Sequence, residues 1–567
     1  MIKRVHVHYF KRFKDEDFDL TDHVVLAGPN NSGKTTLLQA IVVWSLAVQK
    51  WRERRGPESG SKATERSGVA LARQDFTAMP LRLMDHLWTD TITGLQREER
   101  PAGQKPGQPR VLEITLVGTN GGNEWNLGFE FRYSNSELLY VKPIQAEIPE
   151  SADKLSVVYV PPFSGIGHAE TRHDRPYQDL LIGQGKAGDI LRNLLFEVHG
   201  HPDASKWTEL CRRVEELFRV KLEKPEYSGT PHIVCEYTRQ DTKAGKGRAR
   251  LHLDIASAGS GFHQVLLLLG FFYARPATVL LLDEPDAHLH VILQKQIYDM
   301  LRRVATRQNC QLLIATHSEV LIDNTAPTQI LSFYGEPHRL AVNTERDQVR
   351  EALKRLSAMD ILLTEKSLGV IYVEDQTDAD LVAAWAHLLG HPMAEWFDTH
   401  RFVHLMHGRR PKEAQGHFFA LKSVNPSVHG FLLLDGDNRN EMDHELKSDG
   451  LTIGRWKRYE AESYLLHPDA LRRFLLKRVW PPDAEGADEF LREQLPLVVY
   501  KSPMDDHDYL SAIPASKTLL PDYFRRANLD LPKSEYYLIA EAMRPDEIPP
   551  EVKEKLDAMA RTLGVGG

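Results

Sequence analysis

A glycine-rich stretch, GPNNSGKT at Gly28–Thr35, constrains this chain more than any other feature. It fits the pattern G-x-x-x-x-G-K-[ST] at every constrained position, and it follows an apolar run that predicts a strand at His23–Ala27. In a strand–loop–helix unit such a loop cradles phosphates with its backbone N–H groups, while Lys34 meets the β- and γ-phosphates and Thr35 ligates Mg²⁺. The alternative is a coincidental glycine-rich turn, which average residue usage produces in roughly one chain in fifty of this length.

Three later stretches suit the same chemistry. VLLLDEP is an apolar strand ending in Asp283, suited to the Mg²⁺ shell, and Glu284, suited to polarising an attacking water. SAGSGFHQ, at Ser257–Gln264, opens an apolar helix with small residues that leave N–H groups free for a γ-phosphate. LLIATHSEVL ends a buried strand beside His317, which could sense that phosphate. Taken singly, the second stretch is equally a plain turn, and a lone histidine in this place is more often structural.

The order of these four stretches is the specific signal. Residues 1–330 resemble the ABC ATPase heads of the recombination-repair and overcoming-lysogenization-defect (OLD) group. The resemblance implies a homodimer as the minimum active unit, Asp283 and Glu284 as the Walker B pair, and His317 as the switch histidine. It implies a Walker A loop and a signature formed by Gly28, Asn30, Asn31, Ser32, Gly33, Lys34, Thr35 and Thr36, and by Ser257, Gly259, Ser260 and Gly261. Because AGSGF stands where LSGGQ is usual, the choice between Ser257 and Ser260 as the γ-phosphate contact stays open.

A second set of acidic residues follows a new α/β pattern that begins after about Ser357. Glu374 ends a predicted strand and Asp378 begins the next helix, while FLLLDGDN ends another strand with Asp435 and Asp437. Four carboxylates at the carboxyl ends of neighbouring strands repel one another unless divalent cations neutralise them. Two Mg²⁺ ions there would suit phosphodiester cleavage. The alternatives are a helix cap at Asp378 and a simple turn after the second strand.

E-x-x-x-D followed by D-x-D resembles the Toprim catalytic core of topoisomerases, primases and OLD nucleases, with Asp375 where glycine is usual. The resemblance implies Mg²⁺, with Mn²⁺ as an alternative ion, and makes Glu374 catalytic as well as a metal ligand. It also implies a further acid in RWKRYEAESYLL, with Glu462 ahead of Glu460, and a lysine near the scissile phosphate, assigned to Lys517.

We therefore predict two α/β domains. Residues 1–360 form an ABC/AAA-type ATPase domain with a mixed sheet, an antiparallel meander at 111–143 and a helical insertion at 177–220. Residues 361–567 form a Toprim-like metal-dependent nuclease domain with a C-terminal helical region. The polar segment Lys14–Phe18 is predicted to be a turn. The chain has no apolar run long enough to span a bilayer, three widely spaced cysteines and a net charge of −8, so we expect a cytoplasmic protein without a membrane partner or disulfide framework.

Relatives with this layout, including Gabija-type nucleases and the PARIS anti-phage systems, act in bacterial defence. The resemblance thus implies ATP-regulated cleavage of nucleic acid, either DNA or tRNA, with a phage-encoded protein as the trigger or partner. Two alternatives remain. The chain is an ATPase sensor that holds a toxic effector with an inactive Toprim-like domain, or it is a repair enzyme that processes DNA ends.

Overall fold

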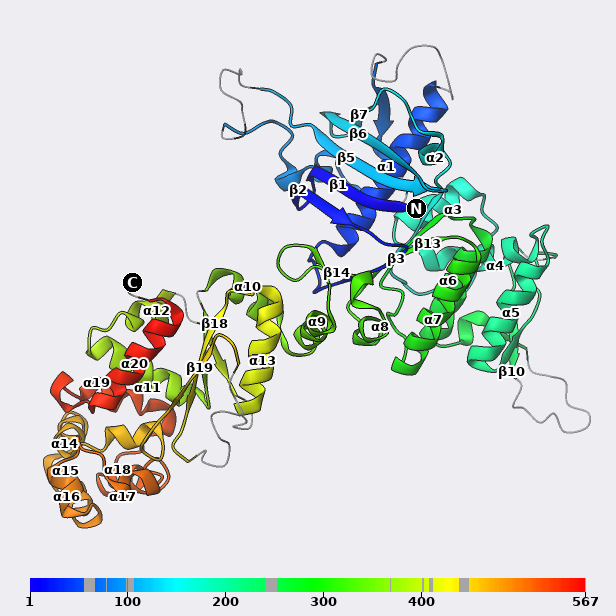
Figure 1. The fold of residues 1–567 in the computed structure, drawn as a ribbon. Coiled ribbons are helices and arrows are strands. Elements are labelled where there is room, and N and C mark those ends of the chain that lie inside the picture. The colour runs from blue at the N-terminus through cyan, green and yellow to red at the C-terminus, as the bar shows by residue number, and fades with distance from the viewer. Residues whose placement is uncertain are drawn as a thin grey trace, which may run out of the picture. The chain divides into compact units, whose positions relative to one another are not determined.

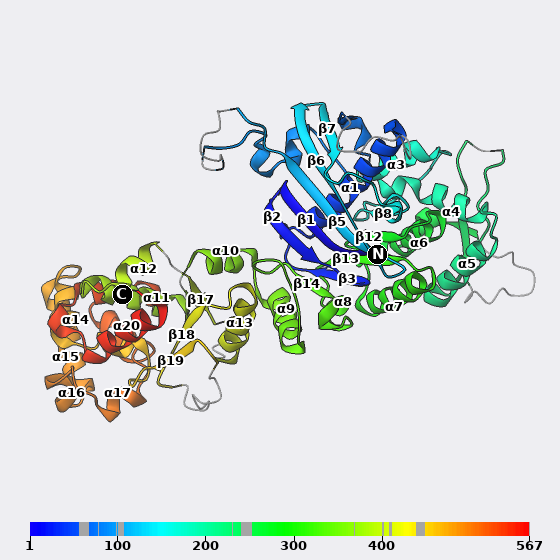
Figure 2. The same ribbon diagram turned by 45° about the horizontal axis from the view of Figure 1, so that its top comes forward.

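The computed structural model describes residues 1–565 apart from 56–66, 78, 98, 100–106, 230, 240–251, 368, 400–401, 407–410 and 438–447. The chain forms two compact units, Met1–Arg346 and Asp347–Gly567. Figure 1 and Figure 2 show the elements of each unit from two directions. The second unit begins before the expected boundary at residue 360, because helix α10 (Ala358–Lys366) packs against α13 (Pro411–Val424) of that unit.

The first sheet of unit 1 is antiparallel, in the order β2-β1-β5-β6-β7-β4. The predicted meander is present as its strands β5, β6 and β7, and alternating residues such as Leu112, Ile114 and Leu116 face the core. The strands are β1 (Ile2–Phe10), β2 (Phe13–Asp19), β4 (Val69–Ala72), β5 (Leu112–Asn120), β6 (Asn123–Asn135) and β7 (Leu138–Pro143).

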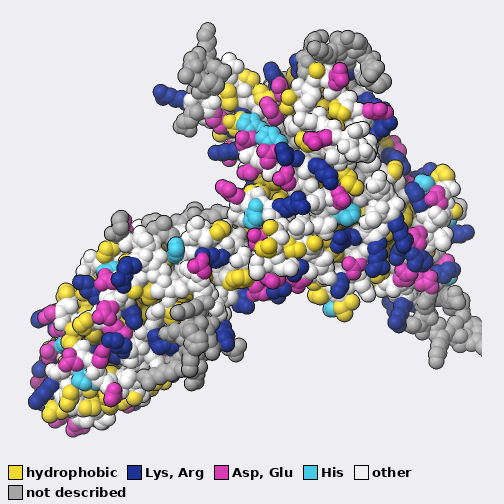
Figure 3. All heavy atoms as spheres, viewed as in Figure 1, with side chains coloured by type: hydrophobic (Ala, Val, Ile, Leu, Met, Phe, Trp, Pro, Cys, Tyr) yellow, Lys and Arg dark blue, Asp and Glu magenta, His cyan; other side chains and the backbone are white. Residues whose placement is uncertain are grey.

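The predicted turn at Lys14–Phe18 is wrong, since those residues lie within β2. The chain reverses earlier, between β1 and β2, where Lys11 has a φ of 52°. Asp15 and Asp17 lie 3.2–3.4 Å from the imidazoles of His6 and His8 on the neighbouring strand. Histidines and acids lie side by side on this face of unit 1 in Figure 3. Cross-strand pairing of this kind lets a charged segment form an edge strand.

The second sheet of unit 1 has the order β15-β14-β3-β13-β12-β8 and is parallel except for β15. Its central strands are continuously apolar, as expected of parallel strands covered on both faces. Helix α1 (Lys34–Arg55) packs against strands of both sheets and shares one core with them. The strands are β3 (His23–Ala27), β8 (Val157–Val160), β12 (Val279–Asp283), β13 (Gln311–Thr316), β14 (Ile330–Ser332) and β15 (His338–Arg339).

The predicted helical insertion is present between β8 and β12. It comprises α3 (Arg175–Gly183), α4 (Leu191–His199) and α5 (Ser205–Phe218), and α6 (Ser260–Ala274) packs against α4 and α5. A small sheet joins them, formed by β9 (Val220–Leu222), β10 (Glu236–Arg239) and β11 (His252–Asp254). The remaining helices of unit 1 are α2 (Glu150–Asp153), α7 (Val291–Arg307) and α8 (Glu319–Asp323). Helix α9 (Asn343–Arg355) begins in unit 1, and most of it belongs to unit 2.

Unit 2 is built on a parallel sheet in the order β17-β16-β18-β19. Its strands are β16 (Gly369–Val373), β17 (Val403–Leu405), β18 (His429–Leu434) and β19 (Leu451–Arg455). One face packs on α10 and α13, and the other on α11 (Gln376–Leu388), α12 (Met393–Thr399) and the C-terminal helices. Because β16 and β18 are parallel neighbours, the residues that follow them meet at one edge of the sheet.

The C-terminal helices complete the core of unit 2 around Trp385, Tyr464 and Tyr523. They are α14 (Pro468–Leu476), α15 (Pro481–Gln494), α16 (Leu497–Lys501), α17 (Asp508–Ala512), α18 (Leu519–Arg526), α19 (Tyr537–Ala542) and α20 (Pro550–Leu563). Within the described ranges of both units, no helix combines the length and the apolar character needed to cross a bilayer.

Candidate functional site

The glycine-rich loop lies between β3 and α1, as the sequence predicts. Its backbone takes the left-handed conformation at Asn31 and Gly33, where φ is 62° and 112°. A Cβ atom on Gly33 would lie 2.7 Å from Cζ of Phe13, so glycine is required there by both conformation and space. Asn30 and Asn31 are exposed at the tip of the loop, whereas Ser32 and Thr36 are half-buried.

Lys34 is turned back onto its own loop. Its Nζ donates to the carbonyl oxygens of Gly28 and Pro29 at 2.8 and 2.7 Å. Burial lowers the pKa of Lys34, and the neighbouring Glu284 and Asp283 partly oppose that effect. The two carbonyls take the place of the phosphate oxygens that such a lysine contacts when nucleotide is bound.

Thr35 and Asp283 lie together, as ligands of one Mg²⁺ shell must. The Thr35 hydroxyl is 3.0 Å from both carboxylate oxygens of Asp283, and the Tyr159 hydroxyl donates to Oδ2 of the same carboxylate at 3.0 Å. Burial raises the pKa of Asp283 despite these two hydrogen bonds. A hydroxyl and a carboxylate that meet at the start of α1 fit the oxygen ligands that Mg²⁺ prefers.

Glu284 and His317 form a pair at the ends of β12 and β13. Nδ1 of His317 lies 3.0 Å from Oε1 of Glu284, and this hydrogen bond lowers the pKa of Glu284 and raises the pKa of His317. Glu284 also has a φ of 50°, a conformation that costs a non-glycine residue on the order of 1–2 kcal/mol and that collects at functional sites. The predicted carboxylate and switch histidine therefore contact each other directly.

The signature residues lie at the start of α6. Gly259 precedes the first helical residue, Ser260, and Ser257, Gly259 and Ser260 are all exposed. The Ser257 hydroxyl donates to the carbonyl of Asp254 at 2.7 Å. Gly261 is half-buried, and the helix is buried from Phe262 onward. A helix start with small, exposed residues leaves space for a phosphate to approach from outside the unit.

Two residues that the sequence analysis missed link these parts. Gln264 in α6 donates from Nε2 to the carbonyl of Pro285 at 3.2 Å, which ties the signature helix to the segment after Glu284. Asp286 is buried and accepts a 2.6 Å hydrogen bond from Thr316. The second aspartate in DEPD was a signal for Asp286, whereas the Gln264 contact depends on packing across the fold.

In unit 2 three of the predicted acids converge. Carboxylate oxygens of Glu374, Asp435 and Asp437 lie within 4.8 Å of one another, and the first two residues are buried. Gly436 is required between the aspartates, since a Cβ there would lie 2.2 Å from the carbonyl oxygen of Arg458. Oδ1 of Asp437 is buried and has no hydrogen-bond partner among the described residues. Three converging carboxylates with an unsatisfied buried oxygen fit a divalent cation.

The pKa values record the crowding of these acids. Burial raises the pKa of Asp435 to about 10, with Asp378 and Glu374 adding repulsion. Burial also raises the pKa of Asp378 to about 8, with Asp375 and Glu462 adding to the effect. Without a cation, the cluster therefore retains protons at neutral pH.

Asp375 and Asp378 share the cap of α11. Asp375 is the N-cap and accepts from the N–H groups of Thr377 and Asp378, while Asp378 accepts from the N–H group of Asp375 at 3.1 Å. The alternative that Asp378 is the N-cap is wrong, because Asp375 is the N-cap and Asp378 is the N3 residue of the same capping box. Asp378 also lies outside the closest carboxylate set. Asp375, which replaces the usual glycine, makes the cap and also binds a lysine.

That lysine is Lys533, which the sequence analysis did not single out. Its Nζ lies 2.8 Å from Oε1 of Glu462 and 3.0 Å from Oδ2 of Asp375. Glu462 is fully buried beside the cluster, whereas Glu460 accepts a hydrogen bond from the backbone of Ser516. Lys517, the predicted lysine, is exposed, and Lys533 is a lysine that directly contacts Glu462 and Asp375.

Comparison with known proteins gives matches in unit 1. A family model described as "AAA domain, putative AbiEii toxin, Type IV TA system" matches residues 246–323, and a model described as "AAA domain" matches residues 4–84. No curated protein matches the chain. The two matched segments contain the phosphate loop, the signature, Asp283, Glu284 and His317.

Solved structures of SMC heads show a weak likeness. The SMC head domain from Thermotoga maritima has 14% identity and a TM-score of 0.32, covering 60% of this chain and 99% of that one. An SmcHead bound to the C-winged helix domain of ScpA has 15% identity and a TM-score of 0.34, with 58% and 94% covered. The Smc head of Pyrococcus furiosus, bound to the C-terminal domain of ScpA, has 14% identity and a TM-score of 0.32, with 58% and 92% covered.

The family matches and the geometry agree on unit 1. Its phosphate loop, its Thr35–Asp283 pair and its Glu284–His317 pair lie within segments that match AAA domain models. ATP, with Mg²⁺, is the cofactor that such a domain implies. Two segments of unit 1 therefore match AAA domain models and hold the residues of an ATPase site.

Proposed function

We propose that unit 2 is a Toprim-like, Mg²⁺-dependent nuclease of the OLD type, and that the ATPase domain of unit 1 regulates it. The convergence of Glu374, Asp435 and Asp437 within 4.8 Å carries the proposal. These acids follow neighbouring parallel strands, the position at which open α/β sheets bind ligands. Mg²⁺, or Mn²⁺ in its place, would supply a nucleophilic water and neutralise charge on the phosphoryl oxygens.

The residues around these acids have distinct tasks. Glu374, Asp435 and Asp437 hold the cations, and Asp378 and Glu462 add negative charge behind them. Lys533 is held by Glu462 and Asp375. Burial alone would lower the pKa of Lys533, but the hydrogen bonds and charges of the two carboxylates raise it, so Lys533 stays cationic. Its position beside the acids suits it to bind the phosphate that is cleaved, the task first assigned to Lys517. The substrate class is nucleic acid, either DNA or tRNA.

In unit 1, Lys34 would leave the Gly28 and Pro29 carbonyls to bind the β- and γ-phosphates. Thr35 and Asp283 would hold Mg²⁺, and Glu284 would orient the water, with His317 reporting the γ-phosphate. The exposed start of α6, at Ser257 and Ser260, fits over the nucleotide of a second copy, so the active assembly is at least a homodimer. ATP binding and hydrolysis in unit 1 would then regulate the nuclease of unit 2.

Purified protein incubated with Mg²⁺ or Mn²⁺ and plasmid, single-stranded DNA or tRNA tests the nuclease. We expect cleavage of at least one substrate, its loss in Asp435→Asn, and its retention in Asp449→Asn. Asp449 is fully exposed and lies outside the acid cluster, so it is a matched control. Cleavage that survives Asp435→Asn would overturn the assignment of the site.

One observation favours a second function, that of an ATPase sensor holding a toxic effector. Asp375 replaces a glycine and, with Glu462, already binds the Lys533 ammonium, so an internal cation offsets part of the charge that a metal would neutralise. ATP hydrolysis without cleavage of any of the three substrates, in either metal, would support this scaffold function against the nuclease.

We place the activity in anti-phage defence, triggered by a phage-encoded protein. The family description matched at residues 246–323 reads "AAA domain, putative AbiEii toxin, Type IV TA system", and this mention of a toxin system supports a defence role. Plaque counts on cells that express wild-type protein or Asp435→Asn test this role. Protection against DNA damage in place of phage would favour DNA end-processing in repair.

A further inference from the structure

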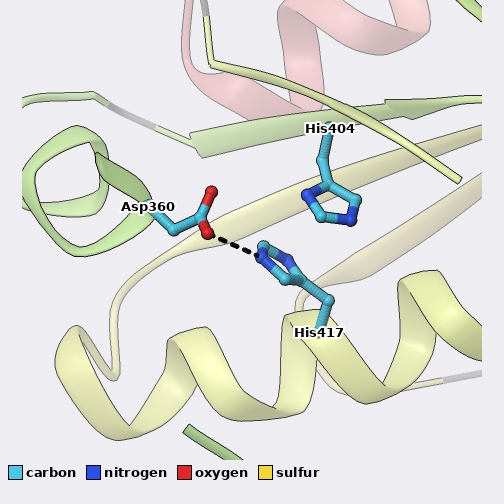
Figure 4. Close-up of side chains that lie close together, drawn as sticks. All are labelled: Asp360, His404 and His417. Carbon is cyan, nitrogen blue, oxygen red and sulfur yellow. Dashed lines mark ion pairs between the residues drawn. The ribbon is translucent and has the colours of Figure 1, made fainter. Parts of the chain in front are cut away.

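Three side chains outside the acid cluster meet on one face of the unit 2 sheet. Asp360 comes from α10, His404 from β17 and His417 from α13, and each offers a ligand atom within 4.8 Å of the others. Figure 4 shows the three side chains pointing toward one another. His404 pairs in register with Tyr372 of β16, and Tyr372 belongs to the core on the α10 and α13 face. The group shares no residue with Glu374, Asp435 and Asp437.

The central side chain of this group is His417, which is only 2% exposed. The Tyr372 hydroxyl lies 2.9 Å from Nδ1 of its ring. Nε2 points to Oδ2 of Asp360 across 3.7 Å, which is too long for a hydrogen bond, and it has no hydrogen-bond partner among the described residues. A buried imidazole nitrogen that faces a carboxylate without bonding to it leaves room for an ion between them.

The surroundings of Asp360 and His417 resemble those of metal ligands. Oδ2 of Asp360 accepts hydrogen bonds from the backbone N–H and the hydroxyl of Ser357 at 2.8 and 2.7 Å. Tyr372 holds the other nitrogen of His417. Outer hydrogen bonds of this kind fix the orientation of carboxylate and imidazole ligands in metal sites. The His404 ring stacks on the His417 ring with centroids 3.8 Å apart, so a second imidazole lies beside the first one.

We propose that Asp360, His404 and His417 bind one transition-metal ion of the Zn²⁺ type. Two imidazoles and a carboxylate suit Zn²⁺, whereas Mg²⁺ prefers the all-oxygen acid cluster. Zn²⁺ binds nitrogen and oxygen at roughly 2.0–2.2 Å, so donors up to 4.8 Å apart must close by about an ångström. His404 is half-buried on β17, the edge strand of the sheet, where a shift of the strand end could bring its ring closer. Three protein ligands leave a fourth position for water.

Such an ion would join three segments that are distant in sequence. Asp360 lies on the helix before the first strand of unit 2, His404 on an edge strand of three residues, and His417 on the helix that follows. An ion bound only by the folded state stabilises that state by mass action. The proposed ion therefore fastens α10 and β17 to the body of unit 2.

The test uses the full chain dialysed against Zn²⁺ in the presence of excess Mg²⁺, which occupies the acid cluster and the phosphate loop. Zinc per chain is measured by inductively coupled plasma mass spectrometry, and affinity by competition with a chelator. We expect about one Zn²⁺ per wild-type chain, and an affinity at least about tenfold weaker in His404→Gln, Asp360→Asn and His417→Gln. His387→Gln should keep the wild-type affinity, since His387 is an exposed histidine paired with Asp398 elsewhere in unit 2.

Circular dichroism checks that each variant is folded. His404→Gln should disturb folding less than His417→Gln, because His404 is only half-buried whereas His417 is buried. Co²⁺ loaded into the wild type should give the visible absorption of a site with nitrogen ligands, and the spectrum should be lost in folded His404→Gln. The proposal is overturned if the wild type retains no Zn²⁺, or if the three ligand variants bind it as tightly as the wild type. The group is then a His417–Asp360 ion pair with a stacked histidine.

Discussion

The phosphate loop of unit 1 and the acid cluster of unit 2 handle charge in opposite ways. In unit 1, each charged group is met by a protein group of suitable kind. Lys34 donates to two carbonyls, and Asp283 accepts from Thr35 and Tyr159. In unit 2, acids face acids, and burial with mutual repulsion raises the pKa of Asp435 to about 10.

This difference separates a site that is complete without its ligand from one that is not. The internal contacts of Lys34 and Asp283 hold the empty loop in a stable state that nucleotide must displace, which suits a switch. In unit 2, burial and mutual repulsion raise the pKa values of Asp378 and Asp435, even though Lys533 lies nearby and is bound to Glu462 and Asp375. Unit 2 therefore depends on cations for its charge balance, and unit 1 does not.

The largest expected effect comes from Lys34→Ala. Loss of the only cation that the loop aims at the β- and γ-phosphates should lower ATP hydrolysis by about a hundredfold or more. Metal binding by unit 2, followed by calorimetry, should be unchanged, because the acid cluster has its own ligands. Lys221→Ala replaces an exposed lysine of the same unit and should leave hydrolysis as it is. Full ATPase activity in Lys34→Ala would remove the phosphate loop from the mechanism.

Asp435→Asn should change metal affinity and stability in opposite directions. It removes a ligand, so the affinity of unit 2 for Mg²⁺ should fall by more than about tenfold. It also removes an acid whose pKa burial raises to about 10, so the metal-free variant should unfold at a higher temperature than the metal-free wild type. Scanning calorimetry with and without Mg²⁺ measures both effects, with Asp449→Asn as the control. A metal-free variant that is less stable than the wild type would show that Asp435 is satisfied by the protein alone.

The two regions also differ in how far the sequence could predict them. The phosphate loop, Asp283 and His317 lie on local patterns in which a strand ends at a loop, and the structure has each of them at the predicted strand end. The same reasoning predicted that Glu374 lies next to Asp435, because the carboxyl ends of neighbouring parallel strands lie at the same edge of the sheet.

The contacts that sequence reasoning missed depend on packing between distant segments. Lys533 precedes α19 and reaches Glu462 only because the C-terminal helices fold back over the sheet, and its surroundings in the sequence contain no motif. The sequence analysis assigned this role to Lys517, because the sequence does not show in which direction a lysine in a loop points. His404 and His417 stand alone in the sequence and meet Asp360 only through the β17–β16 register and the packing of α10 on α13.

A pH series should sharpen the comparison further. The acids of unit 2 have raised pKa values, about 8 for Asp378 and about 10 for Asp435, so they hold protons that the unfolded chain releases near pH 4. Their contribution to stability without metal is complete below that pH and is lost as the pH rises toward 8–10. Mg²⁺ must displace these protons, so its affinity for unit 2 should rise between pH 6 and 9. Calorimetry in buffers of different ionisation enthalpy should detect proton release, and its absence would contradict the raised pKa values.

The smallest effect is expected from Tyr159→Phe in unit 1. The Tyr159 hydroxyl donates to Asp283 and lowers the pKa of that carboxyl against the effect of burial. Without it Asp283 should hold its proton to a higher pH, so the acidic limb of the ATPase pH profile should move upward and the Mg²⁺ requirement should rise by about tenfold or less. A tyrosine that only fills space would leave the limb in place, because phenylalanine fills nearly the same volume. Such a result would mean that the Thr35 hydroxyl, at the start of α1, is enough to stabilise the charged Asp283 carboxylate without Tyr159.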